Sequence, residues 1–159
     1  MKKILVCLMV VVCLLGLGSV AFGKSGSAII PHFDASGSVQ AYYLYISNIT
    51  SEPISVVVTL YKQDGSIVIG SNVSNYGAGI SDWNINPNNA TVSFTLDSNC
   101  TAEVYTTSSL VGTTWGYGNI EWSQNSRASQ GLVAYAFAEC NSAYHFTKND
   151  VMINNGQPF

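Results

Sequence analysis

The sequence predicts an all-β protein, built as an antiparallel, immunoglobulin-like β-sandwich of about eight to ten short strands. Three features of the 159-residue chain lead to this class. After an apolar N-terminal stretch, apolar and polar residues alternate with a period of two, as in strands that bury one face. Clusters of Gly, Asn, Asp and Ser interrupt the alternation, and no segment of useful length has helical periodicity. Two packed sheets would bury one apolar face of every strand, and a closed β-barrel is the alternative.

The first part of the chain, residues 1–23, is expected to be a secretory signal peptide. Two lysines precede an almost unbroken apolar run over residues 4–17, and the small residues Ala21 and Gly23 follow it. This order is that of a cleavable leader. The run is shorter than the roughly 20 apolar residues of a spanning helix, which argues against a permanent anchor. We expect cleavage between Gly23 and Lys24, with a competing site after Ala21. The remainder would have no membrane span and would be secreted, periplasmic or on the cell surface.

Residues 24–159 are expected to form a single domain, because this length supports one core but not two. Charged residues make up only 9% of the chain, and the formal net charge of −3 becomes more negative when the two leader lysines are removed. Sparse basic residues argue against a nucleic-acid partner, which requires clustered Lys and Arg. Ser, Thr, Asn and Gly supply the polarity instead, a composition common in secreted repeat, adhesin and filament proteins.

The alternation also predicts the individual strands. The clearest is Ile54–Lys62, which follows Pro53, a position where a missing N–H does no harm. An Asp-Gly pair at 64–65 predicts a tight hairpin turn that returns into Ser66–Ile69. We expect Gly70–Asn89 to be the longest irregular stretch. The other expected strands are Ala28–Phe33, Gln40–Asn48, Ala90–Leu96, Ala102–Thr106, Tyr117–Ser123, Leu132–Cys140, Ala143–Phe146 and Val151–Ile153.

Three stretches carry a resemblance to known proteins: YLYISNITSEPISVVVTLYKQDGSIV, NPNNATVSFTL and GYGNIEW. They are similar to small, largely uncharacterised secreted bacterial β-sandwich proteins of immunoglobulin-like type. In these proteins an Asn-x-Thr-x-x-Pro turn leads into an apolar strand that ends in a "TLY…DG" hairpin. The resemblance covers the larger part of the chain after the leader. It implies the sandwich fold and export, and it transfers no catalytic or binding residue.

Two cysteines, Cys100 and Cys140, remain after the leader. In an oxidising compartment we expect them to form a disulfide that closes a loop of about 40 residues and contributes roughly 3–4 kcal/mol. The alternative is a pair of unpaired thiols. With only His32 and His145 in addition, the chain offers too few ligands for a zinc site, and we expect no metal and no cofactor.

The candidate interaction surface consists of residues on two expected strands. Along Gln40–Asn48, the alternation places Tyr43 and Tyr45 opposite the apolar face, and Val57 and Tyr61 would join them if the strand 54–62 pairs alongside. Tyrosine combines apolar area with a hydroxyl at low entropic cost, so this patch suits a protein interface or the stacking of a sugar. The alternative is that these side chains are covered and belong to the core, because tyrosine and valine are also good strand formers.

No catalytic motif stands out in the sequence. A glycosidase would need two carboxylates that face each other across a sugar. Nothing in the sequence brings together any two of the four acidic residues considered for this role, which are named at the end of this paragraph. Charged residues on the outward positions of strands ordinarily keep a sheet soluble. We therefore expect a non-enzymatic structural or adhesive domain that associates with itself or with an envelope protein, using Lys24–Phe33 as an added strand. A monomeric carbohydrate-binding module, with a glycan as partner, is the alternative. The carboxylates considered are Asp82, Glu103, Glu121 and Glu139.

Overall fold

The computed structural model describes residues 23–35, 40–68, 73–86, 91–107, 114–125, 128–141 and 146–159. Almost all of the expected signal peptide, residues 1–22, lies outside these ranges. No helix within the described ranges has the length and apolar character needed to cross a membrane.

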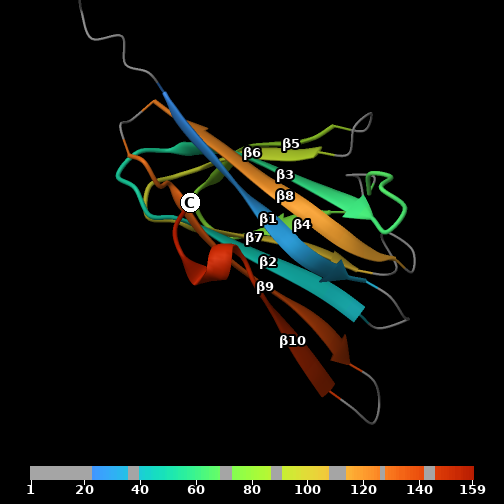
Figure 1. The fold of residues 1–159 in the computed structure, drawn as a ribbon. Coiled ribbons are helices and arrows are strands. Elements are labelled where there is room, and N and C mark those ends of the chain that lie inside the picture. Colours follow the sequence, from blue (N-terminus) through green and yellow to red (C-terminus); the bar gives the residue numbers. More distant parts are fainter. Residues whose placement is uncertain are drawn as a thin grey trace, which may run out of the picture.

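The described residues form ten strands in two antiparallel sheets that pack face to face (Figure 1). Sheet 1 has the strand order β1-β8-β3-β6-β5, and sheet 2 has the order β10-β9-β2-β7-β4. The two sheets are separate, which confirms the predicted β-sandwich and contradicts the alternative of one closed sheet. The strands are β1 Lys24–Asp34, β2 Gln40–Asn48, β3 Ile54–Lys62, β4 Ser74–Tyr76, β5 Ile80–Ile85, β6 Thr91–Leu96, β7 Thr101–Thr107, β8 Trp115–Gln124, β9 Leu132–Asn141 and β10 Phe146–Met152.

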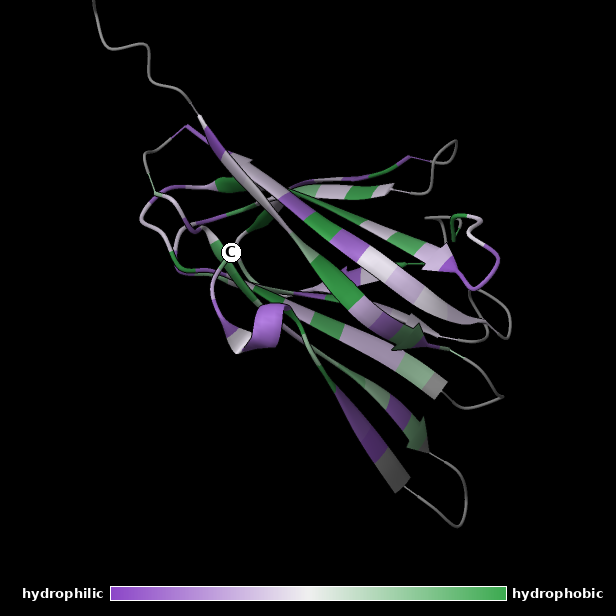
Figure 2. Ribbon diagram, in the orientation of Figure 1, coloured by the Kyte–Doolittle hydropathy of each residue, from purple (hydrophilic) through white to green (hydrophobic). Residues whose placement is uncertain are grey.

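The core lies between the sheets, where every strand directs alternate side chains. On β2, Tyr42, Leu44 and Ile46 are buried, whereas the residues between them are partly exposed. Figure 2 shows the same alternation as successive apolar and polar bands along the strands. The same alternation occurs on β6, where Val92, Phe94 and Leu96 are buried. The fully buried apolar side chains include Ile30, Phe33, Tyr42, Leu44, Ile46, Ile54, Val56, Leu96, Ile120, Leu132 and Ile153.

The expected hairpin after β3 is only half formed. Gly65 has the positive φ of +81° that the turn requires, and its N–H donates to the Lys62 carbonyl. The returning strand expected over Ser66–Ile69 is wrong, because the described part of it makes a single bridge between Tyr61 and Ile67. The reason is topological: β8 runs along one side of β3, and β6 pairs with the other side as far as Thr59. Only the end of β3 remains free for the returning residues, where the Lys62 N–H donates to the Ser66 carbonyl and the Val68 N–H to the Leu60 carbonyl.

Two strands replace the irregular stretch expected over Gly70–Asn89. Strand β5 is an edge strand of sheet 1, and β4 is an edge strand of sheet 2. A bulge at Asp82, which has a φ of +54°, interrupts β5. Trp83 stacks on Phe94 of β6, with ring centroids 5.4 Å apart. At the other end of the chain, β10 covers Phe146–Met152, so the strand expected over Val151–Ile153 begins five residues earlier than predicted. The remainder of Ala143–Phe146 lies outside the described residues.

The side chain of Asn48, at the end of β2, connects the two sheets. It is only 2% exposed, and its amide nitrogen Nδ2 lies 2.8 Å from the carbonyl oxygen of Glu52, 3.1 Å from that of Leu96 and 3.0 Å from that of Asp97. Leu96 is the last residue of β6. An amide from sheet 2 therefore donates hydrogen bonds to the end of a sheet 1 strand and to the loop that follows β2.

The buried Thr50 extends this connection to a second strand of sheet 1. Its backbone N–H donates to Asn48 Oδ1 at 2.9 Å, and its hydroxyl lies 2.8 Å from the same oxygen and 3.2 Å from Gln124 Oε1 on β8. Asn48, Thr50 and Pro53 are the three specified residues of the Asn-x-Thr-x-x-Pro turn noted in the sequence. Two of them thus form the polar link between the sheets.

Replacing Asn48 by Ala should lower the free energy of unfolding by about 3 kcal/mol, because several buried carbonyl and N–H groups would lose their partner. Urea unfolding followed by circular dichroism measures this loss. Asn149→Ala on the exposed side of β10 removes the same amide and should change stability by less than about 0.5 kcal/mol. Equal effects of the two substitutions would contradict the role given to Asn48.

For Tyr42 we expect the opposite effect on stability. Its hydroxyl is buried without a hydrogen-bond partner in the described part of the chain, and burial raises its pKa. The ring lines a small apolar space between the sheets with Leu44, Val58 and Val104. Tyr42→Phe removes an unsatisfied polar group and should leave the urea midpoint unchanged or higher. A clear loss of stability would show that the hydroxyl has a partner in solution, such as a buried water.

Candidate functional site

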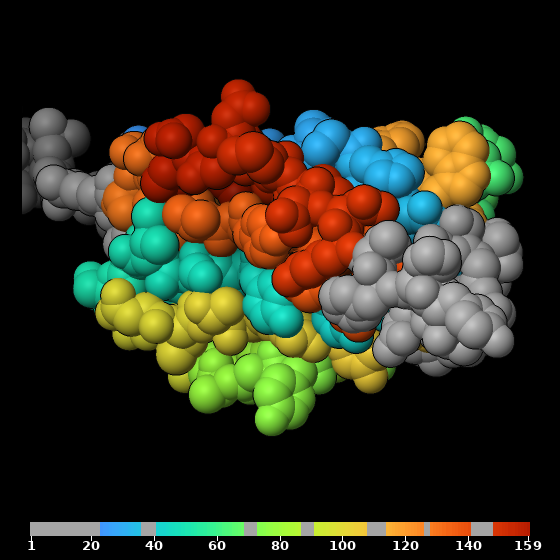
Figure 3. All heavy atoms as spheres, turned by 90° about the horizontal axis from the view of Figure 1, so that it is seen from below, coloured from blue at the N-terminus to red at the C-terminus, as the bar shows by residue number. Residues whose placement is uncertain are grey.

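The outer face of sheet 2 carries a continuous group of aromatic side chains. In the strand register, Tyr43 of β2 lies between Phe137 of β9 and Tyr105 of β7, and Tyr45 lies between Tyr135 and Glu103 of the same two strands. Figure 3 views this side of the molecule, with β10, β9, β2, β7 and β4 following one another from red to green. We call the set the aromatic face: Tyr43, Tyr45, Tyr76, Tyr105, Tyr135 and Phe137.

The rings at the centre of the aromatic face cover one another. Phe137 stacks on Tyr43 and Tyr45, with centroid distances of 4.9 Å and 5.9 Å and interplanar angles of 26° and 21°. The ammonium nitrogen of Lys148 lies 3.6 Å from the centroid of the Phe137 ring. Tyr43 also stacks on Tyr105 at 6.1 Å. Phe137 is therefore only 8% exposed although it points away from the core. A partner would meet ring edges and phenol hydroxyls here.

Carboxylates surround these rings. The Tyr45 hydroxyl donates a hydrogen bond to Glu103, and burial, this bond and the nearby negative charges raise the pKa of Tyr45 to about 12. Burial and the charges of Glu139 and Glu103 also raise the pKa of Tyr43. At the β10 side, the Tyr135 hydroxyl donates to Asp150, which raises the pKa of Tyr135. The phenols thus stay protonated at neutral pH, and they lie among negative charges.

The predicted surface of Tyr43, Tyr45, Val57 and Tyr61 is divided between the two sheets. Tyr43 and Tyr45 lie on the outer face of sheet 2, as the alternation predicts. Val57 and Tyr61 belong to β3 in sheet 1, because the neighbours of β2 are β7 and β9 and not β3. Tyr61 stacks instead on Tyr117 of β8, with centroids 4.9 Å apart. The expectation that these four residues share one surface is therefore wrong.

Sequence reasoning missed four residues of the aromatic face: Tyr76 and Tyr135 at its sides, and Tyr105 and Phe137 in its central stack. The latter two alternate with buried residues, since Tyr105 follows Val104 and Phe137 follows Ala136. This alternation places each ring on an outer face. The order of the strands, which brings the rings next to Tyr43, is not visible in the alternation.

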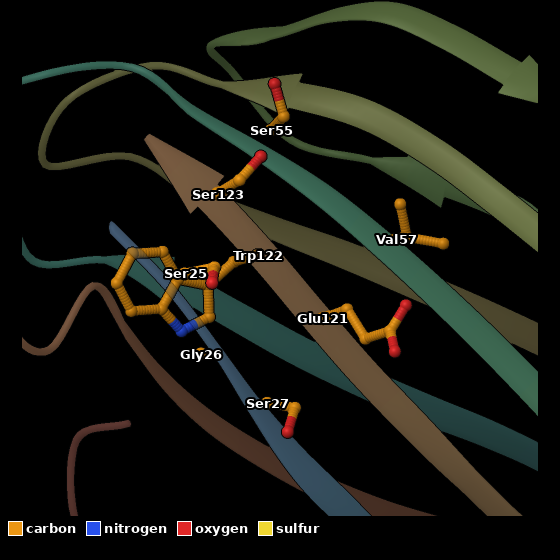
Figure 4. A pocket seen from close by; sticks show the side chains of 8 residues that line it. All are labelled: Ser25, Gly26, Ser27, Ser55, Val57, Glu121, Trp122 and Ser123. Atoms are coloured by element: carbon orange, nitrogen blue, oxygen red, sulfur yellow. The ribbon is translucent and has the colours of Figure 1, made fainter. Parts of the chain in front are cut away.

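The outer face of sheet 1 is hollowed where β1, β8 and β3 lie side by side (Figure 4). Small side chains leave a shallow space of about 580 Å³, and a second, more polar hollow continues it toward Gly23. The carboxylate within it, Glu121, accepts a hydrogen bond from Asn119 at 3.1 Å. Trp122 borders the space from below and reaches β1 at Gly26, where an added Cβ would lie 2.6 Å from its ring nitrogen. The other lining residues are Ser25, Ser27, Ser55, Val57 and Ser123.

The expected disulfide between Cys100 and Cys140 is wrong. Cys140 lies opposite Gln40 at the start of β2, whereas the carbonyl of Cys100 accepts a hydrogen bond from the N–H of Asn48 at the end of that strand. The length of β2 therefore separates them by roughly 27 Å, at about 3.4 Å per residue. A disulfide needs Cα atoms within about 7 Å. Both thiols are free and partly exposed.

Within the described ranges, no group of three or more His, Cys, Asp or Glu side chains could hold a metal ion. His32 is exposed on β1, and His145 lies outside the described residues.

The four candidate carboxylates lie on different surfaces. Glu103 and Glu139 share the outer face of sheet 2, where both act on Tyr43. Glu121 lies on the outer face of sheet 1, and Asp82 accepts a hydrogen bond from the Thr95 hydroxyl on β6 at 3.1 Å. The structure therefore brings two of the four carboxylates onto one face.

Comparison with known proteins gives a likeness of fold. No protein-family model and no curated protein matches the chain. The crystal structure of Thermotoga maritima 1070 has a TM-score of 0.50 and 11% identity, over 82% of this chain and 96% of that one. A collagen-binding domain from a Staphylococcus aureus adhesin has a TM-score of 0.30 and 7% identity, over 87% and 91% of the two chains. A family 123 glycoside hydrolase from Clostridium perfringens has a TM-score of 0.24 and 13% identity, over 84% and 28%. At these identities the first likeness concerns the fold alone, and the other two carry no argument.

The raised pKa of Tyr45 predicts how stability depends on pH. In an unfolded chain the tyrosine phenol loses its proton near its ordinary pKa of 10.0, whereas in the folded domain the pKa of Tyr45 is raised to about 12. The unfolded state therefore binds fewer protons between these values, and the free energy of unfolding should fall as the pH rises through them. Tyr45→Phe should make this fall less steep in urea unfolding at a series of pH values. The same slope in both proteins would show that Tyr45 titrates normally.

Proposed function

We propose that this protein is a non-enzymatic adhesive or structural domain that acts outside the cytoplasm and docks a basic protein surface on its aromatic face. The observation that carries the proposal is the stack of Tyr43, Phe137 and Tyr45 on an outer sheet face, bordered by carboxylates. Tyrosine-rich patches of this kind are typical of protein interfaces.

The geometry of the rings favours a protein over a sugar as the partner. A pyranose ring stacks on an aromatic face that is open to solvent. Here Phe137 is covered by Tyr43, Tyr45 and Lys148, and Tyr43 is also covered by Tyr105. What the centre of the patch offers is a set of ring edges and hydroxyls, which suits side chains and backbone groups of another protein.

The charges favour a basic partner. Glu103, Glu139 and Asp150 lie on or beside the aromatic face, and the ammonium of Lys148 is already placed over Phe137. Arg or Lys side chains of a partner could pair with these carboxylates and pack along the tyrosine rings at the same time. Such complementarity directs association and disfavours acidic partners. A second copy of this acidic face would be repelled.

The sequence supports a site of action outside the cytoplasm. The leader-like N-terminus has the order of a cleavable signal, and a surface rich in hydroxyl and amide groups is usual in exported adhesive proteins. The lack of a disulfide leaves this part of the proposal unchanged, because many exported domains fold without one.

Selection of a random displayed-peptide library on the immobilised domain tests the docking proposal. We expect the enriched peptides to contain Arg or Lys next to aromatic or aliphatic residues, and their binding to weaken as salt is added. The double variant Tyr43→Ser, Tyr45→Ser should lose most of this binding. Because both side chains are partly exposed, the variant should remain folded by circular dichroism.

The matched control is Tyr61→Ser with Tyr117→Ser, which removes the stacked pair from the outer face of sheet 1. This control should bind the selected peptides as the unchanged protein does. Equal losses in both double variants, or enriched peptides without basic residues, would contradict the proposal.

The carbohydrate-binding alternative has one observation in its favour. Tyr76, at 75% exposure, and Tyr135 lie at opposite sides of the aromatic face and are not covered as Phe137 is. A glycan array on the same protein tests this alternative directly. Retention of a glycan that is lost in Tyr76→Ser, together with failure of the peptide selection, would favour the carbohydrate-binding module.

A further inference from the structure

The four edge strands of the sandwich differ in how well they are protected against pairing with another chain. Short strands, bulges and charged side chains are the usual protective features. Strand β4 has three residues, and β5 is interrupted by the bulge at Asp82. Strand β10 carries Lys148 and Asp150 along its length. Three of the four edges thus have a recognisable feature that discourages pairing.

Strand β1 is the exception. Residues 24–30 pair with β8 in an unbroken register, and no described strand lies on the other side of β1. No charged residue occurs between Ser25 and Ile30, and Ile29 on the outer face is 59% exposed. The regular pairing of β1 with β8 ends at Ile30, because Pro31 follows and the register between the two strands shifts before Phe33. Between Lys24 and Pro31 this edge thus presents six consecutive uncharged residues in regular strand geometry, to which a further strand can pair.

We infer that the partner of this edge is a second copy of the same chain, whose β1 pairs antiparallel with the first. Such pairing would join two copies of sheet 1 into one continuous ten-stranded sheet about a two-fold axis. An antiparallel pair of identical strands is self-complementary, because each free edge supplies the backbone donors and acceptors that the other edge lacks. The pairing uses both β1 edges, so the assembly closes as a dimer. The protected edges β4 and β5 leave no equivalent site for further growth.

The sequence of β1 also sets the register of this pairing. Ser27 is the middle residue of the unbroken segment 24–30, so a two-fold axis at Ser27 pairs the whole segment. In this register each Ile29 lies opposite Ser25 of the second copy. Ser25 lines the shallow hollow on the outer face, and its small side chain leaves room for an apolar neighbour. The exposed isoleucine of each copy would thus be covered at the rim of the hollow in the other.

The two-fold axis of such a pair stands perpendicular to the joined sheet. Both copies of sheet 2 then lie on the same side, and both aromatic faces point in the same direction. If the proposed docking function holds, a dimer would engage two sites on one surface, and its avidity would exceed the affinity of either site. The pairing itself does not depend on that function, because it uses a different sheet.

Disulfide trapping tests the register. The protein is expressed from the full chain and purified after export, in a background with Cys100→Ser and Cys140→Ser. Ser27→Cys places two thiols opposite each other across the axis, where Cα atoms of paired strands lie about 4.5–5.5 Å apart and a disulfide can form. Oxidation with copper phenanthroline should give a covalent dimer. Ser25→Cys, treated identically, should remain monomeric, because its two thiols would be roughly 14 Å apart.

Analytical ultracentrifugation of the protein without added cysteines provides the second measurement. We expect a concentration-dependent dimer, and Ser27→Lys should weaken it several-fold because two like charges would face each other at the axis. Ser81→Lys, on the exposed opposite edge of sheet 1, makes the same change of charge and should leave the dimer intact. A monomer at all concentrations, cross-linking of Ser25→Cys but not of Ser27→Cys, or equal effects of the two lysine variants would overturn the inference. A normal dimer with no peptide binding would contradict only the docking proposal.

Discussion

The buried amide of Asn48 is the contact on which the arrangement of the two sheets depends. Hydrophobic burial between sheets is strong but non-directional, and it permits one layer to slide or rotate over the other. Asn48 and Thr50 add directional hydrogen bonds from the end of β2 to the end of β6 and to Gln124 on β8. This link fixes the position of one sheet over the other at this end of the sandwich.

The strands themselves could largely be predicted from the sequence, because each strand signals its buried face by local alternation. The pattern of β2, with Tyr42, Leu44 and Ile46 inward, follows from neighbouring residues alone. Strand order depends instead on long-range pairing, which local alternation does not encode. Val57 and Tyr61 were therefore assigned to the wrong neighbours, and Cys100 and Cys140 to a bond that the length of β2 prevents. The short strands β4 and β5 escaped prediction because edge strands of three to six residues show little alternation.

The two outer faces of the sandwich have different chemistry. Sheet 2 presents packed rings and carboxylates, whereas sheet 1 presents hydroxyls around a shallow hollow with Glu121, beside a single stacked pair, Tyr61 and Tyr117. The same period of two produces both faces, because every second residue is free of the demands of the core. A small domain can in this way carry one surface suited to a different protein and a second surface of other chemistry. The edge of β1 belongs to neither face and is available for pairing with a second copy.

The positions of the two free cysteines have a practical consequence. Because Cys100 and Cys140 are not joined to each other, the packing of the described strands does not depend on a bond between them, and a reducing agent should leave this packing intact. The thiols of Cys100 and Cys140 lie near opposite ends of sheet 2. They therefore form a natural pair of attachment points for a donor and an acceptor dye, and energy transfer between them would report the length of the domain as it folds or is stretched.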